Sequence, residues 1–376
     1  MNGLSELRTA LVHHWLVNRR GGESVFDALL HMFPHADVFT LVYDRERASP
    51  ELRDRTVHTS LLQKLPRASR WYPFYLPFFA QAAKRLDLSD YELVISSDAA
   101  IVKGVKTGRE TVHVCYCHTP MRYVWSGYDT YRERLGPVSR RLLPIIGEYL
   151  RRRDFEAAQR VTYFVANSRN VASRIARYYN RESKVIYPPV DTRYFVPAPN
   201  FKRTEDYCLL VSPLVPYKRV DLVVEAFNRT GRPLVVIGDG NERPALERRA
   251  RSNIQILGPQ SRAAIRSYLQ NCKAFVFGGE EDFGIVLAEA LACGSPILAY
   301  GRGGAPEIVE DGRTGILFEE QSVDSLLEGM SRLERKRFDP QENRQSVLRF
   351  NQERFIEEFN GFINEIGKAG SRRDIA

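Results

Sequence analysis

The sequence has no long hydrophobic run and little cysteine. Its most apolar stretch, Trp71 to Ala80, holds ten residues with two prolines, whereas a membrane-spanning helix needs about 20 apolar residues. The N-terminus is too polar for a signal sequence. The five cysteines, an odd number, argue against a disulfide framework. We therefore expect a protein of the reducing cytoplasm that does not span a membrane.

The sequence also lacks a zinc-binding pattern. Cys115, Cys117 and His118 stand close together, but no second pair of ligands follows at the spacing of a zinc site. They lie at the end of the apolar segment Thr111 to Tyr116, which has the length of a strand. We favour a strand end over a metal site at this position.

Length and charge narrow the class of protein. The chain has 376 residues, enough for two domains, and 43% of them are hydrophobic. Its 55 basic and 46 acidic residues give a net charge of +9, which suits nucleic acid, anionic lipid or a phosphorylated substrate. Charge alone does not choose among these three.

Apolar segments of strand length, beginning with Ala10 to Val17, alternate with helical patterns in both halves of the chain. This alternation predicts an α/β fold with two doubly wound parallel sheets joined by right-handed crossovers. A proline-rich connector, Pro188 to Pro199, separates the halves. We place the first domain at residues 1–190 and the second at residues 191–349.

Residues Phe277 to Ile297 carry two carboxylates in a strand, turn, helix, strand pattern. Glu281 falls in the turn and Glu289 inside the helix. Ligands of doubly wound sheets bind beyond the carboxyl ends of the strands, so a carboxylate in that turn faces a cleft. The alternative is that both acids are solvated surface residues.

The motifs around these acids resemble a known family. Glu281 and Glu289 stand in an E-x7-E arrangement, and four segments agree with the family in order: Phe283-Gly284, Glu289 to Ala292, Gly294 to Pro296 and Gly303 to Glu307. Together they resemble retaining glycosyltransferases of family 4, nearest the branch of lipopolysaccharide O-antigen mannosyltransferases. The resemblance runs from about Ala10 to Phe318. It implies GT-B architecture, in which two Rossmann-like domains face a cleft, and a C-terminal helix at about residues 350–370 that crosses back to the first domain.

The resemblance assigns roles to the acidic stretch. Glu289 would accept hydrogen bonds from the ribose hydroxyls of the nucleotide, as acidic residues do in dinucleotide folds. Glu281 would hold the sugar's hydroxyls near the reacting carbon. The residues that follow it would form the donor-sugar loop: Asp282, Phe283 and Gly284.

Two cations stand between a strand and a helix of the second domain. Lys218 and Arg219 would bind the donor's diphosphate, because fixed positive charge stabilises a leaving group as its charge develops. Lys218 falls on the family's phosphate-binding lysine. The family's usual arginine five residues earlier is replaced by Pro213, and its role could pass to Arg219, to Arg122 or to backbone N–H groups.

Two further candidates lie in the first domain. Gly21 and Gly22 open a helix after the first strand, where unpaired N–H groups and close backbone approach suit a diphosphate or the acceptor. His118 follows the strand that ends at Tyr116, where an imidazole can bond a sugar hydroxyl or a phosphate. The segment His118 to Tyr123 resembles the family's cleft histidine motif, which makes His118 the expected contact of the donor sugar.

The sequence lacks Asp-x-Asp, the motif with which other glycosyltransferases clamp a diphosphate through a metal ion. We therefore expect no metal cofactor, and Lys218 with helix N-termini would take the metal's electrostatic role. The family is thought to retain configuration by front-face substitution, in which the leaving phosphate assists deprotonation of the acceptor.

Two segments interleave aromatic or apolar residues with basic ones. Leu65 to Leu88 does so with prolines at 73 and 77, and Arg140 to Arg160 reads as a basic amphipathic helix. Both suit an anionic membrane surface, although core helices with charged outer faces give the same pattern. We expect reversible, salt-sensitive binding to the inner face of the cytoplasmic membrane, without insertion.

The motifs together predict a retaining glycosyltransferase that moves mannose from GDP-mannose onto a polyprenyl-diphosphate-linked saccharide in bacterial O-antigen, capsule or exopolysaccharide assembly. A UDP-sugar donor is the alternative within the same fold. The alternative outside enzymes is a Rossmann-like module that binds nucleotides or nucleic acid. We expect no nucleic-acid partner, because acids at 281 and 289 would repel a polyanion.

Overall fold

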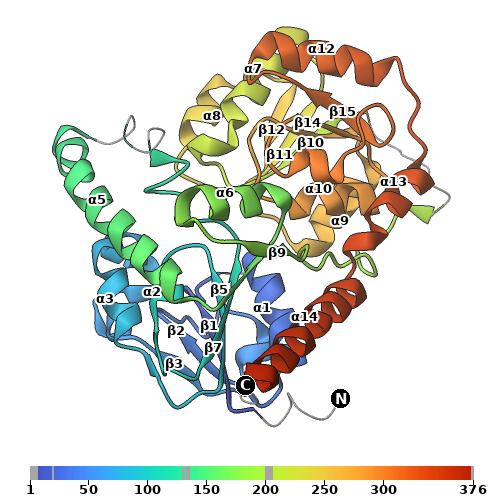
Figure 1. The fold of residues 1–376 in the computed structure, drawn as a ribbon. Helices are drawn as coiled ribbons and strands as arrows, with labels where there is room; N and C mark the ends of the chain where they lie inside the picture. The colour runs from blue at the N-terminus through green and yellow to red at the C-terminus, as the bar shows by residue number, and fades with distance from the viewer. Residues whose placement is uncertain (1–6, 19–20, 129–131, 133–135, 200–205, 374–376) are drawn as a thin grey trace. The chain divides into compact units, whose positions relative to one another are not determined.

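The structure is a computed structural model that describes residues 7–18, 21–128, 132, 136–199 and 206–373. The chain divides into two compact units, each with its own parallel sheet (Figure 1). Unit 1 holds residues Met1–Pro189 together with Glu353–Ala376, and unit 2 holds Val190–Gln352. The α/β prediction with two Rossmann-like parallel sheets is confirmed.

The main sheet of unit 1 has the strand order β3-β2-β1-β5-β7-β8-β9, and all of its pairs are parallel. The chain winds outward in both directions from the β1 and β5 pair, so the order reverses there. Ligands of such sheets bind at the carboxyl ends of the strands beside that point. The strands are β1 Thr9–His13, β2 Asp37–Thr40, β3 Val57–Thr59, β5 Leu93–Asp98, β7 Val112–Cys117, β8 Tyr163–Ala166 and β9 Ser183–Val185; β4 Asp87–Leu88 and β6 Lys106–Thr107 pair separately.

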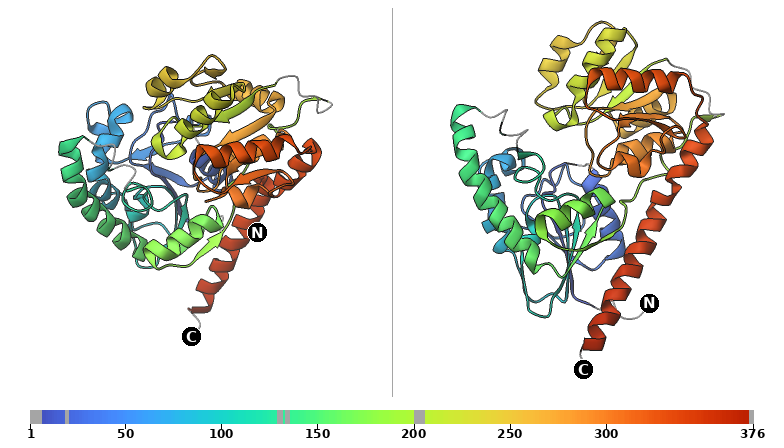
Figure 2. Two further views of the ribbon diagram at one scale, coloured as in Figure 1. Left: turned by 90° about the horizontal axis from the view of Figure 1, so that it is seen from above. Right: turned by 45° about the horizontal axis from the view of Figure 1, so that its top comes forward.

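Alternate residues of these strands feed two cores. Leu11 and Ile95 pack under α1 and α14, whereas Ala10 and Val94 pack on the other face, toward α3 and α5 (Figures 1 and 2). This period of two is what a sheet covered on both faces requires. The helices of unit 1 are α1 Gly21–Met32, α2 Ala68–Trp71, α3 Phe79–Lys84, α5 Pro137–Arg160, α6 Arg169–Tyr179 and α14 Gln352–Arg373, with short 3-10 turns η1 Pro50–Leu52, η2 Leu61–Lys64, η3 Tyr72–Phe78 and η4 Val102–Gly104.

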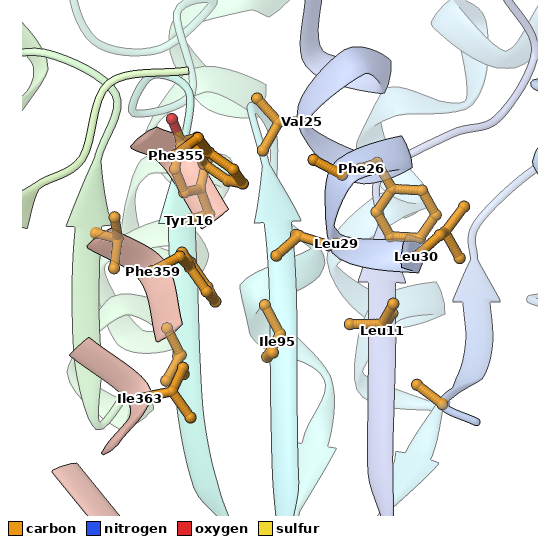
Figure 3. Packing of buried hydrophobic residues seen from close by; sticks show 14 of the residues in the cluster. Leu11, Val25, Phe26, Leu29, Leu30, Ile95, Tyr116, Phe355, Phe359 and Ile363 are labelled. Atoms are coloured by element: carbon orange, nitrogen blue, oxygen red, sulfur yellow. The ribbon is translucent and has the colours of Figure 1, made fainter. Parts of the chain in front are cut away.

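Helix α14 completes the first of these cores. Phe355 and Phe359 lie over Tyr116 of β7, and Ile363 lies further along the same face of the sheet (Figure 3). The rings of Tyr116 and Phe355 are 5.9 Å apart between centroids. Each large apolar side chain buried in this way contributes roughly 1.5–3 kcal/mol, so the last helix is an integral part of unit 1.

A buried ion network braces the other face of unit 1. The Lys103 ammonium lies 3.0 Å from Asp98 Oδ2 and 2.5 Å from Asp154 Oδ1, and the three side chains are at most 1% exposed. Trp125 Nε1 and the Tyr179 hydroxyl both donate to Asp154 Oδ2 at 2.7 Å. The network joins the end of β5 to η4, α5 and α6.

Unit 2 has the strand order β12-β11-β10-β13-β14-β15, again parallel throughout, with its reversal at the β10 and β13 pair. Its strands are β10 Cys208–Val211, β11 Leu234–Ile237, β12 Ile254–Ile256, β13 Ala274–Phe277, β14 Ile297–Tyr300 and β15 Gly315–Phe318. Its helices are η6 Pro216–Lys218, α7 Val220–Thr230, α8 Arg243–Arg249, α9 Arg262–Asn271, α10 Ile285–Ala292, α11 Ala305–Ile308, α12 Val323–Glu334, α13 Pro340–Val347 and η7 Leu348–Phe350. Within the described residues of both units, no helix is long and apolar enough to cross a bilayer.

Candidate active site

Lys218 and Glu281 meet at the reversal point of unit 2. Lys218 ends η6, which follows β10, and Glu281 lies in the loop that follows β13. The Lys218 Nζ atom donates to Glu281 Oε1 at 2.6 Å, and the side chains are only 10% and 19% exposed. The two residues that the sequence assigned to the diphosphate and the sugar thus form one ion pair, where a doubly wound sheet binds its ligands.

Glycines bring these two loops together. A Cβ atom on Gly279 would lie 2.8 Å from the carbonyl oxygen of Lys218 and 2.9 Å from its Cα. Gly278 is equally close to Arg219, where a Cβ would meet the carbonyl oxygen at 2.9 Å. The Gly-Gly pair therefore allows the β13 loop to lie directly against the backbone that carries Lys218.

A second backbone contact fixes the loop from the β14 side. The amide of Gly304 donates to the Glu281 carbonyl oxygen at 2.8 Å. Gly303 has φ +69°, and a Cβ there would lie 2.3 Å from that oxygen. Both glycines belong to the segment Gly303 to Glu307 that marked the family resemblance, so this motif positions Glu281.

The three residues of the expected donor-sugar loop differ in their surroundings. Asp282 is partly exposed, whereas the Phe283 side chain is 2% exposed and packs against Phe350 with ring centroids 5.2 Å apart. Gly284 has φ +106° and starts α10, a conformation that favours glycine. Phe283 therefore anchors this loop in the core of unit 2.

Glu289 lies on α10, apart from the ion pair. Its side chain is partly buried and has no hydrogen-bond partner within the described part of the chain. Burial raises its pKa to about 8, the nearby Arg262 opposes this shift, and Asp191 adds to it. Arg262 itself is bound to Asp191, at 2.6 Å. Glu289 is thus a carboxyl group without a hydrogen-bond partner among the described residues.

The Arg219 side chain pairs with an acid of its own helix rather than with Glu281. It adopts φ +51° where α7 begins, and its guanidinium donates to Asp221 at 3.2 Å and 3.5 Å. The side chain closes the first turn of its own helix. The Gly238-Asp239-Gly240 turn is also a packing feature, because a Cβ on Gly238 would lie within bonding distance of the Ser212 carbonyl oxygen.

In unit 1, His118 belongs to a cluster at the carboxyl ends of β1, β5 and β7. His13 of β1 is paired in register with Ser97 of β5. The Ser97 hydroxyl lies 3.0 Å from His13 Nδ1 and 2.8 Å from His118 Nε2, and His14 Nδ1 lies 3.2 Å from the Ser97 carbonyl oxygen. This cluster occupies the reversal point of the first sheet.

Burial keeps the three histidines of this cluster uncharged. It lowers the pKa of His13, His14 and His118 to about 3, and the neighbouring histidines lower the pKa of His118 further. Each ring therefore carries one proton at neutral pH. Neutral rings suit hydrogen bonds with hydroxyl groups better than they suit the binding of an anion.

Gly22, the second residue of α1, lies directly against His118. A Cβ at Gly22 would be 3.5 Å from His118 Nε2, so the expected glycine-rich turn and the expected histidine adjoin one another. Gly21 is the first residue of the same helix and is partly buried.

Sequence reasoning missed His13 and His14. It extended the first strand to Val17, but β1 ends at His13, so these histidines stand at a strand end rather than inside a strand. The signal was present as two adjacent polar residues in an otherwise apolar segment, Leu11 to Val17.

The short cysteine stretch is buried strand, as favoured over a metal site. Cys115 and Cys117 lie on β7, and burial raises the pKa of both thiols. Within the residues that the structure describes, no three potential ligands gather as a metal site.

Two family models cover most of the chain. The model for Glycosyltransferase Family 4 matches residues 19–194, and the model for glycosyl transferases group 1 matches residues 193–349. The chain belongs to the GT-B glycosyltransferases of the family 4 type. The resemblance inferred from the sequence motifs is therefore confirmed for this family.

Curated relatives in the family are distant. The chain is 30% identical over 251 residues to the GDP-mannose-dependent alpha-(1-6)-phosphatidylinositol monomannoside mannosyltransferase of Mycolicibacterium smegmatis. The aligned region covers 54% of this chain and 64% of that protein. It is 33% identical over 128 residues to an uncharacterized glycosyltransferase of Methanocaldococcus jannaschii, which covers 33% of this chain and 36% of that protein. The chain thus spans between about a third and two thirds of the length of these relatives.

Solved structures show the same fold at lower identity. Anabaena HepE in complex with UDP and glucose superposes with a TM-score of 0.66 and 16% identity over 96% of this chain and 100% of that chain. Sucrose-phosphate synthase from Thermosynechococcus elongatus superposes with a TM-score of 0.70 and 16% identity, with the same coverage. These likenesses establish the fold.

Proposed function

We propose that this chain is a retaining glycosyltransferase that transfers mannose from GDP-mannose to a polyprenyl-diphosphate-linked saccharide in bacterial polysaccharide assembly. The observation that carries the proposal is the Lys218–Glu281 ion pair at the reversal point of a nucleotide-binding type of sheet. Mannose and GDP are favoured because the relative from Mycolicibacterium smegmatis is described as GDP-mannose-dependent.

The ion pair suggests how the donor is held. In the free protein Lys218 and Glu281 neutralise one another at 2.6 Å. A bound nucleotide sugar offers each of these side chains a new partner. Its diphosphate is an anion that Lys218 can bind, and its sugar hydroxyls can donate hydrogen bonds to Glu281. Donor binding would therefore exchange one internal contact for two contacts with the ligand.

The proposed reaction needs no metal ion. The bond between the sugar's C1 and the diphosphate oxygen breaks, and a bond forms on the same face between C1 and the acceptor's hydroxyl oxygen. The hydroxyl proton passes to the departing diphosphate, so that GDP is the second product. Lys218 would stabilise the charge that develops on this leaving group, and His118 would contact a hydroxyl of the transferred sugar.

A thermal-shift panel tests the donor. A ligand that binds only the folded state adds about 2.7 kcal/mol at 100 times its Kd, so GDP-mannose is expected to raise the melting temperature more than UDP-, ADP- or dTDP-sugars. A larger shift with a UDP-sugar would overturn the choice of GDP-mannose. Salt-sensitive RNA binding without any shift from nucleotide sugars would favour the binding-module alternative.

The raised pKa of Glu289 makes nucleotide binding pH-dependent if this group binds ribose. Ribose hydroxyls donate to the ionised carboxylate, whereas a pKa of about 8 leaves the free group mostly protonated at pH 7. Binding should therefore release a proton, and the affinity for GDP should rise from about pH 6 to about pH 8.5. Calorimetry in buffers of different ionisation enthalpy measures the released proton.

The matched variant for this prediction is Glu289→Gln, whose side chain does not titrate. It should bind GDP more weakly than the parent at high pH and with no pH dependence. The same raised pKa also means that the folded state keeps a proton that the unfolded state loses, so stability should fall as pH rises from about 4.5 to about 8. An unchanged pH profile in Glu289→Gln would remove Glu289 from the ribose site.

Exposed apolar side chains concentrate on two segments of unit 1. Every exposed large hydrophobic residue in the described ranges lies between residues 61 and 78 or between 145 and 155. Phe74 and Phe78 are the most exposed of the first segment, at 78% and 60%, and Ile145 is 71% exposed on α5. Prolines 73 and 77 lie in the 3-10 helix η3, which presents Phe74 and Phe78 to solvent while Phe79 enters the core.

This surface combines exposed rings with exposed cations. Exposed basic residues lie within these two segments or close to them in the sequence: Lys64, Arg67, Arg70, Lys84, Arg85, Arg140, Arg141, Arg152 and Arg153. Helix α5 packs against α3 in unit 1, and the two lie on the same side of its sheet (Figure 2). This surface would bind an anionic membrane with both kinds of residue: the cations would attract anionic lipid while the Phe74 and Phe78 rings lie at the level of the headgroups.

Liposome co-sedimentation tests this surface. Binding to anionic vesicles should weaken with salt, because each basic residue near the surface is worth about 1 kcal/mol, but a residual part should persist at high salt. The double substitution Phe74→Ser, Phe78→Ser should abolish the residual part and leave the salt-sensitive part. Leu348, a partly buried residue of unit 2, provides an apolar control outside these segments as Leu348→Ser. Equal binding to neutral and anionic vesicles would contradict the electrostatic contribution.

A further inference from the structure

A chain of polar contacts leads from α1 to His118. Glu23 Oε1 lies 3.8 Å from His13 Nε2, His13 Nδ1 lies 3.0 Å from the Ser97 hydroxyl, and that hydroxyl lies 2.8 Å from His118 Nε2. His13 and Ser97 are fully buried and Glu23 is 5% exposed. Bulk water therefore does not compete for these contacts.

Only two proton arrangements fit this chain. A hydroxyl has one hydrogen, so Ser97 donates to one histidine and accepts from the other. The two rings are neutral, because burial lowers the pKa of each to about 3, and each carries a single N–H. Choosing the protonated nitrogen of His13 therefore fixes the protonated nitrogen of His118.

Glu23 selects between the two arrangements. His13 Nε2 has no hydrogen-bond partner among the described residues and faces the carboxylate oxygen Oε1 of Glu23. An N–H at this position is attracted to the carboxylate, whereas a nitrogen lone pair is repelled, and both effects are strong in a buried site. The proton of His13 therefore belongs on Nε2, and its Nδ1 accepts from Ser97.

The position of the His13 proton fixes the other protons in these contacts. Ser97 donates to His13, so its oxygen accepts from His118, whose proton must be on Nε2. The Nδ1 atom of His118 is left with a lone pair. We propose that Glu23, His13 and Ser97 are positioning residues that hold His118 in the Nε2–H tautomer, so that Nδ1 accepts a hydrogen from a hydroxyl of the donor sugar.

The consequence is selectivity for one kind of ligand group. A bare Nδ1 attracts a hydroxyl hydrogen, and it repels a phosphate oxygen, which has only lone pairs to offer. Of the two ligands that the sequence left open for His118, this geometry favours the sugar hydroxyl. The sugar contact rests on the proposed glycosyltransferase function, but the tautomer does not.

Nitrogen NMR of the full chain labelled with ¹⁵N-histidine tests the tautomer directly, because protonated and bare ring nitrogens have well-separated shifts. We expect His13 and His118 to be protonated at Nε2. His14 should be protonated at Nδ1, because it faces a carbonyl oxygen, which only accepts. The variant His118→Asn assigns the signals. A proton on Nδ1 of His118, or a mixture of its tautomers, would overturn the proposal.

Two serine variants test the positioning role. Ser97→Ala should lower kcat on the order of tenfold to a hundredfold, with GDP affinity unchanged. The matched control is Ser96→Ala, which removes an equal buried bond from the preceding residue of β5, between Ser96 Oγ and His113 Nε2 at 2.8 Å. Equal losses of kcat in both variants would show that Ser97 has only a structural role and overturn the positioning role.

A variant at Glu23 tests the origin of the preference. Glu23→Leu should admit Nδ1–H signals of His118 that the parent lacks, whereas an unchanged tautomer would remove Glu23 from the chain. These outcomes separate the two proposals. If the protein has the expected tautomers but transfers no sugar, the proton arrangement is supported and the proposed function is contradicted. If it transfers sugar fully with the opposite tautomer, the proposed function is supported and the proton arrangement is contradicted.

Discussion

Lys218→Ala is expected to lower kcat/KM by about 100- to 1,000-fold, the loss that follows removal of one preorganised group from a developing anion. It should also weaken GDP binding, because the diphosphate is charged before the reaction as well as during it. In addition, the variant leaves Glu281 without the ammonium that lies 2.6 Å away, so a carboxylate that repels the donor remains. Steady-state kinetics together with calorimetry of GDP binding measure both parts.

The control for this prediction is Arg232→Ala. Arg232 forms an ion pair with Glu334 at 2.5 Å in the same unit but precedes β11, at the amino ends of the strands. Its loss should leave kcat and GDP affinity unchanged. A second variant, Glu281→Gln, should lower kcat with little change in GDP affinity. If Lys218→Ala kept normal GDP affinity, Lys218 would not be the diphosphate contact.

Asp154→Ala is expected to destabilise unit 1 by about 3–5 kcal/mol, the usual effect of removing one partner from a buried ion pair. The variant leaves the fully buried Lys103 with Asp98 as its remaining carboxylate partner among the described residues. It also removes the acceptor of Trp125 and Tyr179. Urea unfolding followed by Trp fluorescence measures the loss.

An exposed ion pair serves as the control for Asp154. Asp87 binds Lys106 at the same distance, 2.5 Å, but both side chains are more than half exposed. Asp87→Ala should therefore change stability very little, since solvent screens such pairs. Similar small changes in both variants would mean that the Lys103 network contributes little to the fold.

Much of the fold was predictable because sheets covered on both faces leave continuous apolar segments. The strands Leu234–Ile237 and Ala274–Phe277, for example, are buried along their whole length. The short edge strand β3, Val57–Thr59, was not predicted, because it has no fully buried residue and so lacks the apolar signal. The C-terminal helix was expected at about residues 350–370, and α14 spans Gln352–Arg373, separated from α13 by η7 and Asn351.

The candidate site residues could be singled out where family motifs surround them. The motifs pointed to Lys218 and Glu281, and glycines at 278, 279, 303 and 304 allow their loops to lie in contact. Sequence spacing could not reveal that the two side chains pair, since 63 residues separate them. Arg219 shows the opposite case: adjacent to Lys218, it binds Asp221 instead, because its positive φ turns the backbone at the helix start.

The contribution of α14 to the core of unit 1 has a consequence for synthesis of the protein on the ribosome. Domains usually fold in order from the N-terminus as the chain emerges. Here every residue of unit 2 emerges before Phe355, Phe359 and Ile363, which complete the core of unit 1 over one face of its sheet. The half that is made first must therefore wait until the end of translation for its last apolar layer. A nascent chain that stops short of α14 would release a finished unit 2 joined to a unit 1 that chaperones and proteases recognise as incomplete.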